Sequence, residues 1–259
     1  MNKKLKALTV EHLTVNYDKT PALWEINFEI PIGQLVGIIG PNGAGKSSLL
    51  KVLLGLIKPL SGKIEFFGQP LKKAQSQIAY VPQRASVDWD FPITALDVVL
   101  MGRYRKLGFF KWTTKADLEL AHQALEKVEM LPYAHRQISK LSGGQQQRIF
   151  IARALLQDAD LYLMDEPFAG VDMATEKALI ALFNELKSQG KTLFIVHHDL
   201  NTVEQYFDWI ILLNTCLIAS GPTHKEFHSE NIKRAYGRGS ILLDEAKKLS
   251  QHKTSGLQS

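Results

Sequence analysis

The sequence predicts an α/β fold built on a parallel β-sheet, with an antiparallel β region near the N-terminus and a helical lobe inserted between core strands. Four short, nearly continuous apolar runs carry this prediction: LVGIIG, LYLMDE, TLFIVHH and WIILL. Helical segments separate them, and such runs are typical of parallel strands covered on both faces. Between about residues 84 and 139 no such run occurs, and TKADLELAHQALEKVEML instead has helical periodicity.

The remaining elements follow from local patterns. ALTVEHLTVNY and ALWEINFEI alternate between apolar and polar residues, which favours antiparallel strands. GKSSLLKVLLGLI and MATEKALIALFNELKSQG are predicted helices, and GPTHKEFHSENI is expected to open another with a capping box formed by Thr223 and Glu226. We expect a single domain over residues 1–237. Residues 238–259, which are rich in Gly, Ser and Lys, are expected to form a loosely ordered tail.

The amino-acid composition excludes few classes of function. The 259 residues are 45% hydrophobic and 22% charged, which is ordinary for a globular protein. A net charge of +5 suits an anionic ligand, nucleic acid or a cytoplasmic membrane surface and decides among none of them. The single cysteine, Cys216, excludes an internal disulfide and favours a reducing compartment. We expect neither a signal peptide nor a membrane span, because no apolar window is long enough.

A nucleotide site is predicted by GPNGAGKSS, which fits G-x-x-x-x-G-K-[ST]. The motif follows a predicted strand and opens a predicted helix, so its backbone N–H groups and the helix N-terminus can bind phosphates. Lys46 is expected to reach the β- and γ-phosphates of ATP, and the Ser47 hydroxyl to bind Mg²⁺. The predicted nucleotide-binding residues are Gly40, Pro41, Asn42, Gly43, Ala44, Gly45, Lys46, Ser47 and Ser48.

Two acidic residues end the apolar run LYLMDE. Beside a phosphate-binding loop, Asp165 is placed to hold the Mg²⁺ of Mg-ATP. Glu166 follows directly and points elsewhere, so it can polarise the attacking water. The pair therefore predicts hydrolysis of ATP rather than binding alone.

The motif LSGGQ, residues 141–145, supplies a second anion-binding helix start. One chain has no obvious need for two phosphate sites, whereas two chains arranged head-to-tail do. With this motif the sequence resembles the ATP-binding subunits of ABC transporters. The order of motifs also matches that family: the phosphate-binding loop, Gln83, LSGGQ, the Asp165–Glu166 strand, GVD with Asp172, and a histidine.

The resemblance implies roles for further residues. Ser142, Gly143 and Gly144 would contact the γ-phosphate across a dimer, with Gln145 also in the nucleotide site, and Gln83 would contact Mg²⁺ and the attacking water. Tyr17 would stack under the adenine. In IVHHDL, His198 directly precedes the aspartate and would sense the γ-phosphate, while His197 is expected to be structural.

The stretch VPQRASVDWDFPIT fits no amphipathic period, and its longer run resembles the branch of the family that imports manganese, zinc or related iron species. The resemblance covers roughly residues 5–237. We expect Asp88, Trp89, Asp90 and Phe91 to line a groove that receives a helix of the membrane permease. The alternative is that Trp89 and Phe91 belong to the core of the lobe.

The resemblance implies an ATPase subunit of a metal-ion importer, bound peripherally at the cytoplasmic face of the cell membrane. Its expected partners are a second copy of the chain, the permease and, indirectly, an external metal-binding protein; no nucleic acid is expected. An importer of iron chelates or haem is the alternative. A soluble ABC ATPase acting on ribosomes or nucleic acid is disfavoured by the single LSGGQ motif. His224 and His228 could bind a metal, although two histidines alone more often lie on a solvated helix face.

Overall fold

The computed structural model describes residues 6–17, 20–87, 91–107 and 113–237. They form two compact units. The first contains the described residues up to Gln75 and from Phe194 onward, and the second contains those from Ser76 to Leu193. The predicted tail at 238–259 and three residues of the predicted docking segment, Asp88, Trp89 and Asp90, lie outside the described residues.

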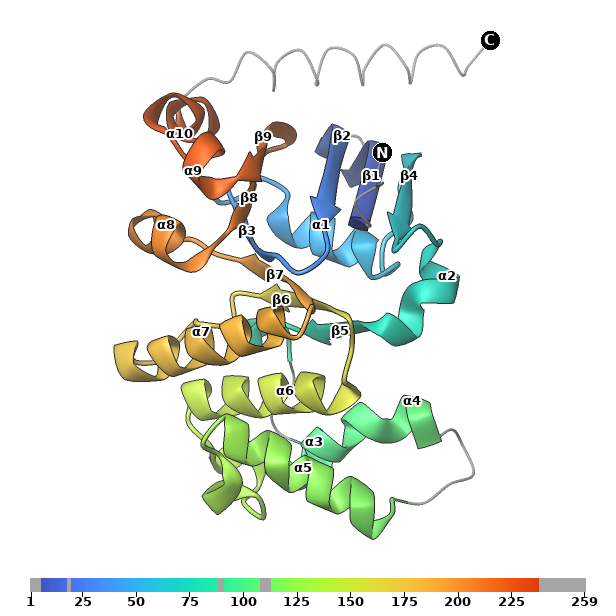
Figure 1. Cartoon of the computed structure of the whole chain (residues 1–259), viewed down its shortest axis with the longest axis vertical. Helices are drawn as coiled ribbons and strands as arrows, with labels where there is room; N and C mark the ends of the chain where they lie inside the picture. Colours follow the sequence, from blue (N-terminus) through green and yellow to red (C-terminus); the bar gives the residue numbers. More distant parts are fainter. Residues whose placement is uncertain (1–5, 18–19, 88–90, 108–112, 238–259) are drawn as a thin grey trace. The chain divides into compact units, whose positions relative to one another are not determined.

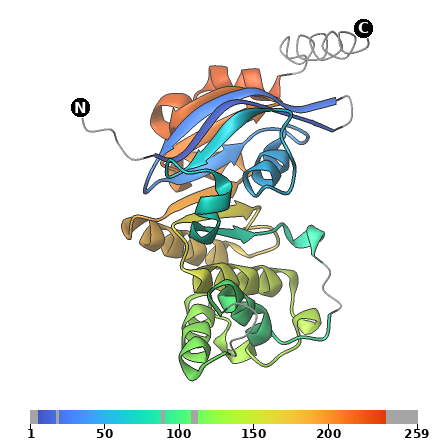
Figure 2. The same ribbon diagram turned by 90° about the vertical axis from the view of Figure 1, so that its right-hand side faces the viewer.

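The first unit contains a three-stranded antiparallel sheet in the order β2-β1-β4, which Figure 2 shows as blue and cyan strands side by side. Its strands are β1 (Lys6–Tyr17), β2 (Thr20–Pro31) and β4 (Ser61–Phe66). Along β2 the apolar residues are buried and the polar residues between them are exposed, as expected for a sheet with one covered face. The predicted antiparallel region is therefore confirmed.

A second sheet of this unit carries the phosphate-binding loop. Strand β3 (Leu35–Ile39) is buried along its whole length and pairs in parallel with β8 (Trp209–Asn214), which pairs antiparallel with β9 (Cys216–Pro222). The N–H of His197, directly after β7 (Thr192–Val196), donates to the Ile38 carbonyl at 3.1 Å. The helices of the unit are α1 (Lys46–Leu53), α2 (Leu71–Ala74), α8 (Val203–Tyr206), α9 (Thr223–Glu226) and α10 (Ser229–Tyr236).

The second unit contains a parallel strand pair, β5 (Ile78–Val81) and β6 (Leu161–Asp165). Helix α7 (Met173–Ser188) follows β6, and Phe168 after the strand packs on Phe183 of this helix with ring centroids 5.9 Å apart. Every residue of β6 is buried. These features agree with the predicted parallel core strands.

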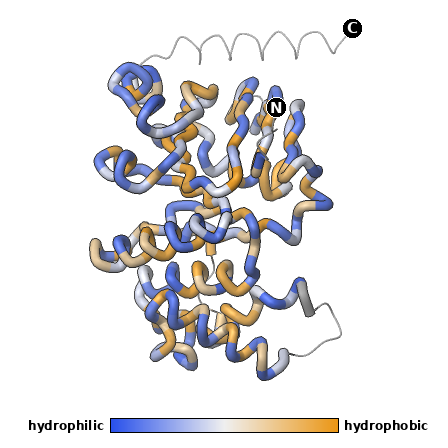
Figure 3. The backbone as a smooth tube through the Cα atoms, viewed as in Figure 1, coloured by the Kyte–Doolittle hydropathy of each residue, from blue (hydrophilic) through white to orange (hydrophobic). Residues whose placement is uncertain are grey.

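The rest of the second unit is helical: α3 (Ala95–Leu100), α4 (Tyr104–Leu107), α5 (Lys115–Lys127) and α6 (Gly143–Gln157). Helices α3, α5 and α6 pack together (Figure 1). In Figure 3 the helices of this unit alternate between hydrophobic and hydrophilic residues, as helices with one buried face do. Capping boxes at Thr94 and Thr114 start α3 and α5. The presence of a helical lobe is therefore confirmed, whereas α6 lies beyond the expected bounds of about residues 84–139.

Short 3₁₀ segments connect these elements at Gln75–Gln77, Arg84–Ser86, Met101–Arg103, Leu131–Tyr133, Ile138–Lys140 and Leu200–Thr202. Among the described residues, no helix combines the length and the hydrophobicity needed to cross a membrane.

The predicted capping box at Thr223 is wrong. Thr223 is the first residue of α9 rather than its cap, and its buried hydroxyl has no hydrogen-bond partner among the described residues. Pro222 occupies the cap position, and proline offers neither a side-chain acceptor nor an N–H for a capping box. His224 and His228 do not share a helix face, because His228 caps the separate helix α10. In the described ranges no three potential ligands gather into a metal site.

Candidate functional site

The phosphate-binding loop, Gly40–Gly45, turns sharply between β3 and α1. Gly45 has φ 93°, and a Cβ atom there would lie 2.4 Å from the Ala22 carbonyl oxygen of β2. A Cβ at Gly40 would lie 2.1 Å from the Leu213 carbonyl oxygen of β8. Only glycine fits either position, because backbone atoms pack directly against the loop.

Lys46 is folded back into the loop that precedes it. The residue is 8% exposed, and its Nζ donates to the carbonyl oxygens of Gly40 at 2.7 Å and Pro41 at 2.9 Å. Asn42 and Gly43 at the tip are exposed, and Ser47 and Ser48 follow Lys46 in the first turn of α1. A cation and a helix N-terminus thus meet at one loop, which is the arrangement that binds phosphate.

Tyr17 ends β1 within the same unit. Its side chain is exposed, with 46% of the residue accessible, and its hydroxyl lies 3.5 Å from the Ser48 Oγ. This distance connects Tyr17 to the first turn of the helix that follows the loop. An exposed aromatic ring at that position is available for stacking on a planar ligand.

The two adjacent histidines after β7 have different surroundings. His197 is buried, its Nε2 lies 2.7 Å from the Thr202 hydroxyl, and its ring packs against Phe207 at 5.3 Å. Burial, followed by the neighbouring His198, lowers the pKa of His197 to about 4. His198 is exposed. A neutral, buried His197 supports the chain locally, whereas His198 is accessible to a ligand.

In the second unit, Gln83 and Glu166 meet. They follow β5 and β6, whose parallel pairing brings Val81 opposite Met164, so both residues leave the same edge of the sheet. The Gln83 Nε2 donates to the Glu166 Oε2 at 3.0 Å. Glu166 has φ 50°, which turns the chain sharply after the buried Asp165. A carboxylate oriented by an amide at the carboxyl ends of strands is suited to act on a bound ligand.

The LSGGQ motif forms the start of α6. The Ser142 hydroxyl accepts a hydrogen bond from the Gln145 N–H at 3.3 Å, and the Gln145 Oε1 accepts one from the Ser142 N–H at 2.9 Å. This capping box fixes the first turn of α6. Asp172 has a similar local role, because its carboxylate caps α7 by accepting from the Thr175 N–H at 3.0 Å.

Sequence reasoning missed a connection between the two motifs of this unit. The Arg84 Nε, one residue after Gln83, donates to the Gln146 Oε1 at 2.9 Å, and the Gln146 Nε2 donates to the Ile138 carbonyl at 3.1 Å. Gln146 is buried on α6 directly after LSGGQ. The hydrophilic run GQQQR gives no sign that two of its glutamines, Gln146 and Gln147, are buried, so this contact has no signal in the sequence.

The second unit also has a hollow of about 480 Å³ whose lining includes none of the motif residues. Burial, together with the charge of Asp165, raises the pKa of Tyr80 in its wall to about 12, so the phenol stays neutral. The Arg153 Nη2 donates to the Tyr80 carbonyl at 3.1 Å. The hollow is lined by Ser76, Ile78, Tyr80, Met101, Gly102, Arg105, Arg153 and Gln157.

A phosphate-binding loop, a carboxylate–amide pair at a strand edge and an LSGGQ helix start together define a nucleotide-hydrolysing cassette. The family described as ABC transporter matches residues 23–169, more than half of the chain. The chain therefore belongs to the ABC transporter family and is one of its ATP-binding, ATP-hydrolysing cassettes.

Individual relatives are similar over nearly the whole chain. The manganese transport system ATP-binding protein MntB of Bacillus subtilis is 55% identical, over 94% of this chain and 98% of that protein. The zinc transport system ATP-binding protein TroB of Treponema pallidum is 54% identical, over 89% of this chain and 87% of that protein.

Solved structures have the same fold. A metal-chelate type ABC transporter in an inward-facing conformation matches with a TM-score of 0.78 and 35% identity, over 90% of this chain and 89% of that chain. A dimeric ATP-binding cassette in a post-hydrolysis state with ADP and Pi matches with a TM-score of 0.73 and 27% identity, over 83% of this chain and 98% of that chain.

Proposed function

We propose that this chain hydrolyses ATP to power import of a divalent metal ion, manganese or zinc, through a membrane permease. The supporting observation for the cargo is the 55% identity, over 94% of this chain, to an ATP-binding protein of a manganese transport system. Iron, free or chelated, is the alternative cargo, since the most similar solved structure described above is of the metal-chelate type.

The residues of the first unit suit a nucleotide. The loop Gly40–Gly45 with Lys46, Ser47 and Ser48 binds the phosphates, and Tyr17 stacks on the adenine. Ser47 of this unit and, in the second unit, Asp165 and Gln83 carry oxygen atoms of the kind that Mg²⁺ prefers, and we keep all three as its proposed ligands in Mg-ATP. When bound, Mg²⁺ neutralises charge on the phosphates.

Hydrolysis depends on Glu166 as the general base. Its carboxylate takes a proton from the attacking water, and the hydrogen bond from Gln83 holds it in one orientation. His198, which is exposed after β7, donates to the γ-phosphate and so responds to its presence. His197 is excluded from this role because it is buried against Thr202.

The start of α6 completes the site of a second copy. In a head-to-tail dimer, Ser142, Gly143 and Gly144 of one chain contact the γ-phosphate bound by the other, and Gln145 lies in the same nucleotide site. ATP binding then closes the dimer and hydrolysis reopens it. The capping box at Ser142 supports this proposal, because it keeps the helix start ordered before the partner arrives.

The permease docks on the second unit. Phe91 is 62% exposed, so the alternative that its side chain lies in the lobe core is wrong. We propose that the segment Asp88–Phe91 receives the permease's cytoplasmic helix. The hollow beside Tyr80 has Arg105 and Arg153 in its wall and suits an acidic side chain of the same partner. The chain then works at the cytoplasmic face of the membrane, and a metal-binding protein delivers the ion from outside.

Elemental analysis of cells tests the cargo. Deleting the gene is expected to lower cellular manganese or zinc, and restoring it should correct the loss. Lys46→Ala should fail to restore it, whereas Lys51→Ala, which changes an exposed lysine on the same helix, should succeed. A drop in iron alone would shift the assignment to iron or iron chelates. Unchanged metal content, with the protein found on ribosomes, would overturn the proposal.

A further inference from the structure

Thr215 has a backbone conformation that β-branched residues rarely adopt. It forms the turn between β8 and β9 with φ 61°, and only 4% of the residue is exposed. Backbone outliers of this kind persist only where neighbouring structure holds them, and they gather at functional sites. The contacts of this turn therefore indicate which part of the site it supports.

The backbone of Thr215 joins the phosphate-binding loop to β2. Its N–H donates to the Ala44 carbonyl at 3.0 Å, and its carbonyl accepts from the Trp24 N–H at 2.8 Å. The Leu213 carbonyl, two residues earlier, is the group that packs against Gly40. One turn thus contacts the loop at Gly40 and at Ala44, and is itself held by β2.

Trp24 lies at a β-bulge in the hairpin of β1 and β2, and this bulge orients its N–H. Leu13 pairs with Ile26 and Val15 with Leu23, so Trp24 and Glu25 together face the single residue Thr14. Glu25 has φ 50°, as a bulged residue can. A compensating bulge lies on β1, where His12 has φ 49°.

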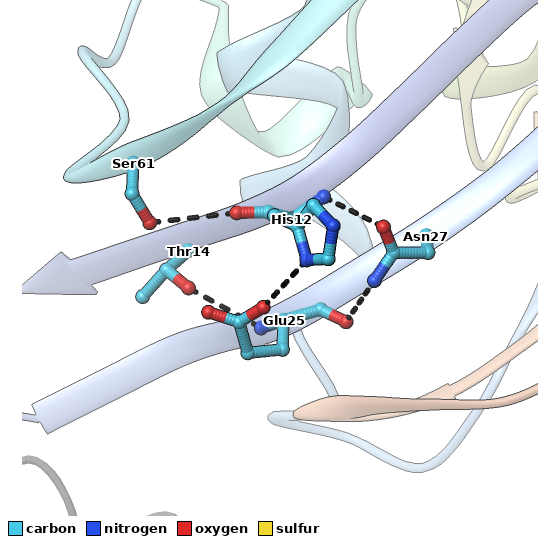
Figure 4. A network of polar contacts seen from close by, with 5 residues as sticks. All are labelled: His12, Thr14, Glu25, Asn27 and Ser61. Atoms are coloured by element: carbon cyan, nitrogen blue, oxygen red, sulfur yellow. Dashed lines mark hydrogen bonds and ion pairs between the residues drawn. The ribbon is translucent and has the colours of Figure 1, made fainter.

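Side chains hold both bulged residues in place (Figure 4). The Asn27 Oδ1 accepts from the His12 N–H at 2.7 Å, and its Nδ2 donates to the Glu25 carbonyl at 2.9 Å. The Glu25 N–H donates to the Thr14 hydroxyl at 3.2 Å, and its carboxylate lies 3.0 Å from the His12 Nδ1. We call His12, Thr14, Glu25 and Asn27 the bulge network. Its bonds replace the ladder hydrogen bonds that the bulges interrupt.

We infer that Thr215 is a positioning residue for the phosphate-binding loop, acting through its two backbone hydrogen bonds, and that the bulge network positions Trp24 to hold it. The bonds fix the Ala44 carbonyl and, with Leu213, the close approach at Gly40. The N–H groups between these points are thereby set for phosphate. This role concerns nucleotide binding and does not depend on which ion the transporter carries.

Thr215→Pro tests the inference, because proline has no N–H and fixes φ near −65°. We expect its affinity for ADP, measured by calorimetry well below the thermal midpoint, to fall about tenfold. Thr215→Gly is the matched variant: glycine adopts φ 61° and keeps the N–H, so ADP affinity should stay within about twofold of that of the unchanged chain.

A second pair of variants, at Glu25 of the bulge network, tests the inference if Thr215→Pro does not fold. Glu25→Val and Glu25→Gly both remove the contact with His12, but only glycine tolerates φ 50°. The valine variant should bind ADP more weakly and the glycine variant normally. Normal ADP binding by a folded proline or valine variant would overturn the inference. Equal weakening in the glycine variants would also overturn it, since side chains rather than backbone would then be responsible.

Discussion

Glu166 stands directly after β6 with a left-handed backbone, and its carboxylate is fixed by Gln83. At the scale of single residues, this pair allows ATP binding and ATP hydrolysis to be tested separately. An amide in place of the carboxylate can still accept the hydrogen bond from Gln83, but it cannot take a proton from water. Replacing the Glu166 carboxylate with an amide should therefore impair hydrolysis without disturbing the contact with Gln83.

We predict that Glu166→Gln binds ATP normally while its turnover falls by about 10²–10⁴-fold. The variant should also accumulate as an ATP-bound dimer. Phosphate release and size-exclusion chromatography measure the two effects. Glu176→Gln, which changes a carboxylate in the first turn of α7, is the control and should hydrolyse ATP at the ordinary rate. Near-normal turnover of Glu166→Gln would remove Glu166 from the role of base.

His197 links stability to pH. Burial keeps its pKa at about 4 in the folded chain, below its ordinary value of 6.5. Between these values the unfolded chain binds a proton that the folded chain excludes, so protons favour unfolding there. The stabilisation is complete above pH 6.5 and is lost as the pH falls towards 4.

We therefore predict that the thermal midpoint falls as the pH is lowered from about 6.5 to about 4. His197→Phe, which keeps an aromatic ring beside Tyr206 and Phe207, should flatten this part of the profile. His135→Gln, a change at an exposed histidine, should leave it in place. A profile that is the same in all three proteins would show that another group is responsible.

At the scale of elements, the bond between Arg84 and Gln146 joins the segment after Gln83 to α6. We predict a coupling of about 1–2 kcal/mol in a double-mutant cycle of Arg84→Met and Gln146→Met, measured from the free energy of unfolding. The ion pair of Lys191 with the exposed Asp158, 3.1 Å apart, is the control, and its coupling should stay below about 1 kcal/mol. Equal coupling in both cycles would contradict a structural role for the Arg84 bond.

Strands with strong periodicity could be predicted, and weaker ones could not. The apolar runs of β3, β6, β7 and β8 can be recognised as strands from the sequence, because parallel core strands are apolar on both faces. Strand β4 begins SGK, β5 has only four residues, and β9 contains Ala, Ser and Gly, so none carries a comparable signal. Pairing with neighbouring strands, rather than composition, makes these segments extended.

In the candidate site, too, some residues could be predicted from the sequence and others could not. Motif spacing identifies Lys46, Asp165 and Glu166, since the chemistry needs these residue types at these positions. The contacts that hold the motifs come from residues without any motif. Thr202 beneath His197 and Thr215 beside Ala44 are examples. Their roles arise from where the chain brings their atoms, which a local pattern does not record.

At the scale of the whole molecule, transport requires the cassette to transmit its state to the permease. We predict that Phe91→Ala keeps ATP binding and changes the free energy of unfolding by no more than about 0.5 kcal/mol, because the side chain is largely exposed. It should fail to copurify with the permease. Leu131→Ala, at another exposed apolar residue of the same unit, should copurify normally. A permease-bound Phe91→Ala chain that supports full uptake would exclude this residue from docking.

The capping box of α6 also determines which protons of the LSGGQ motif can exchange with solvent. The amide hydrogens of Ser142 and Gln145 are already engaged with each other's side chains. Those of Gly143 and Gly144 lie in the first turn, where a helix has no acceptor of its own to offer. In deuterium oxide these two glycine amides should therefore exchange within seconds in the free chain. If ATP slows their exchange, the exchange rate of these two amides would measure how long the dimer stays closed.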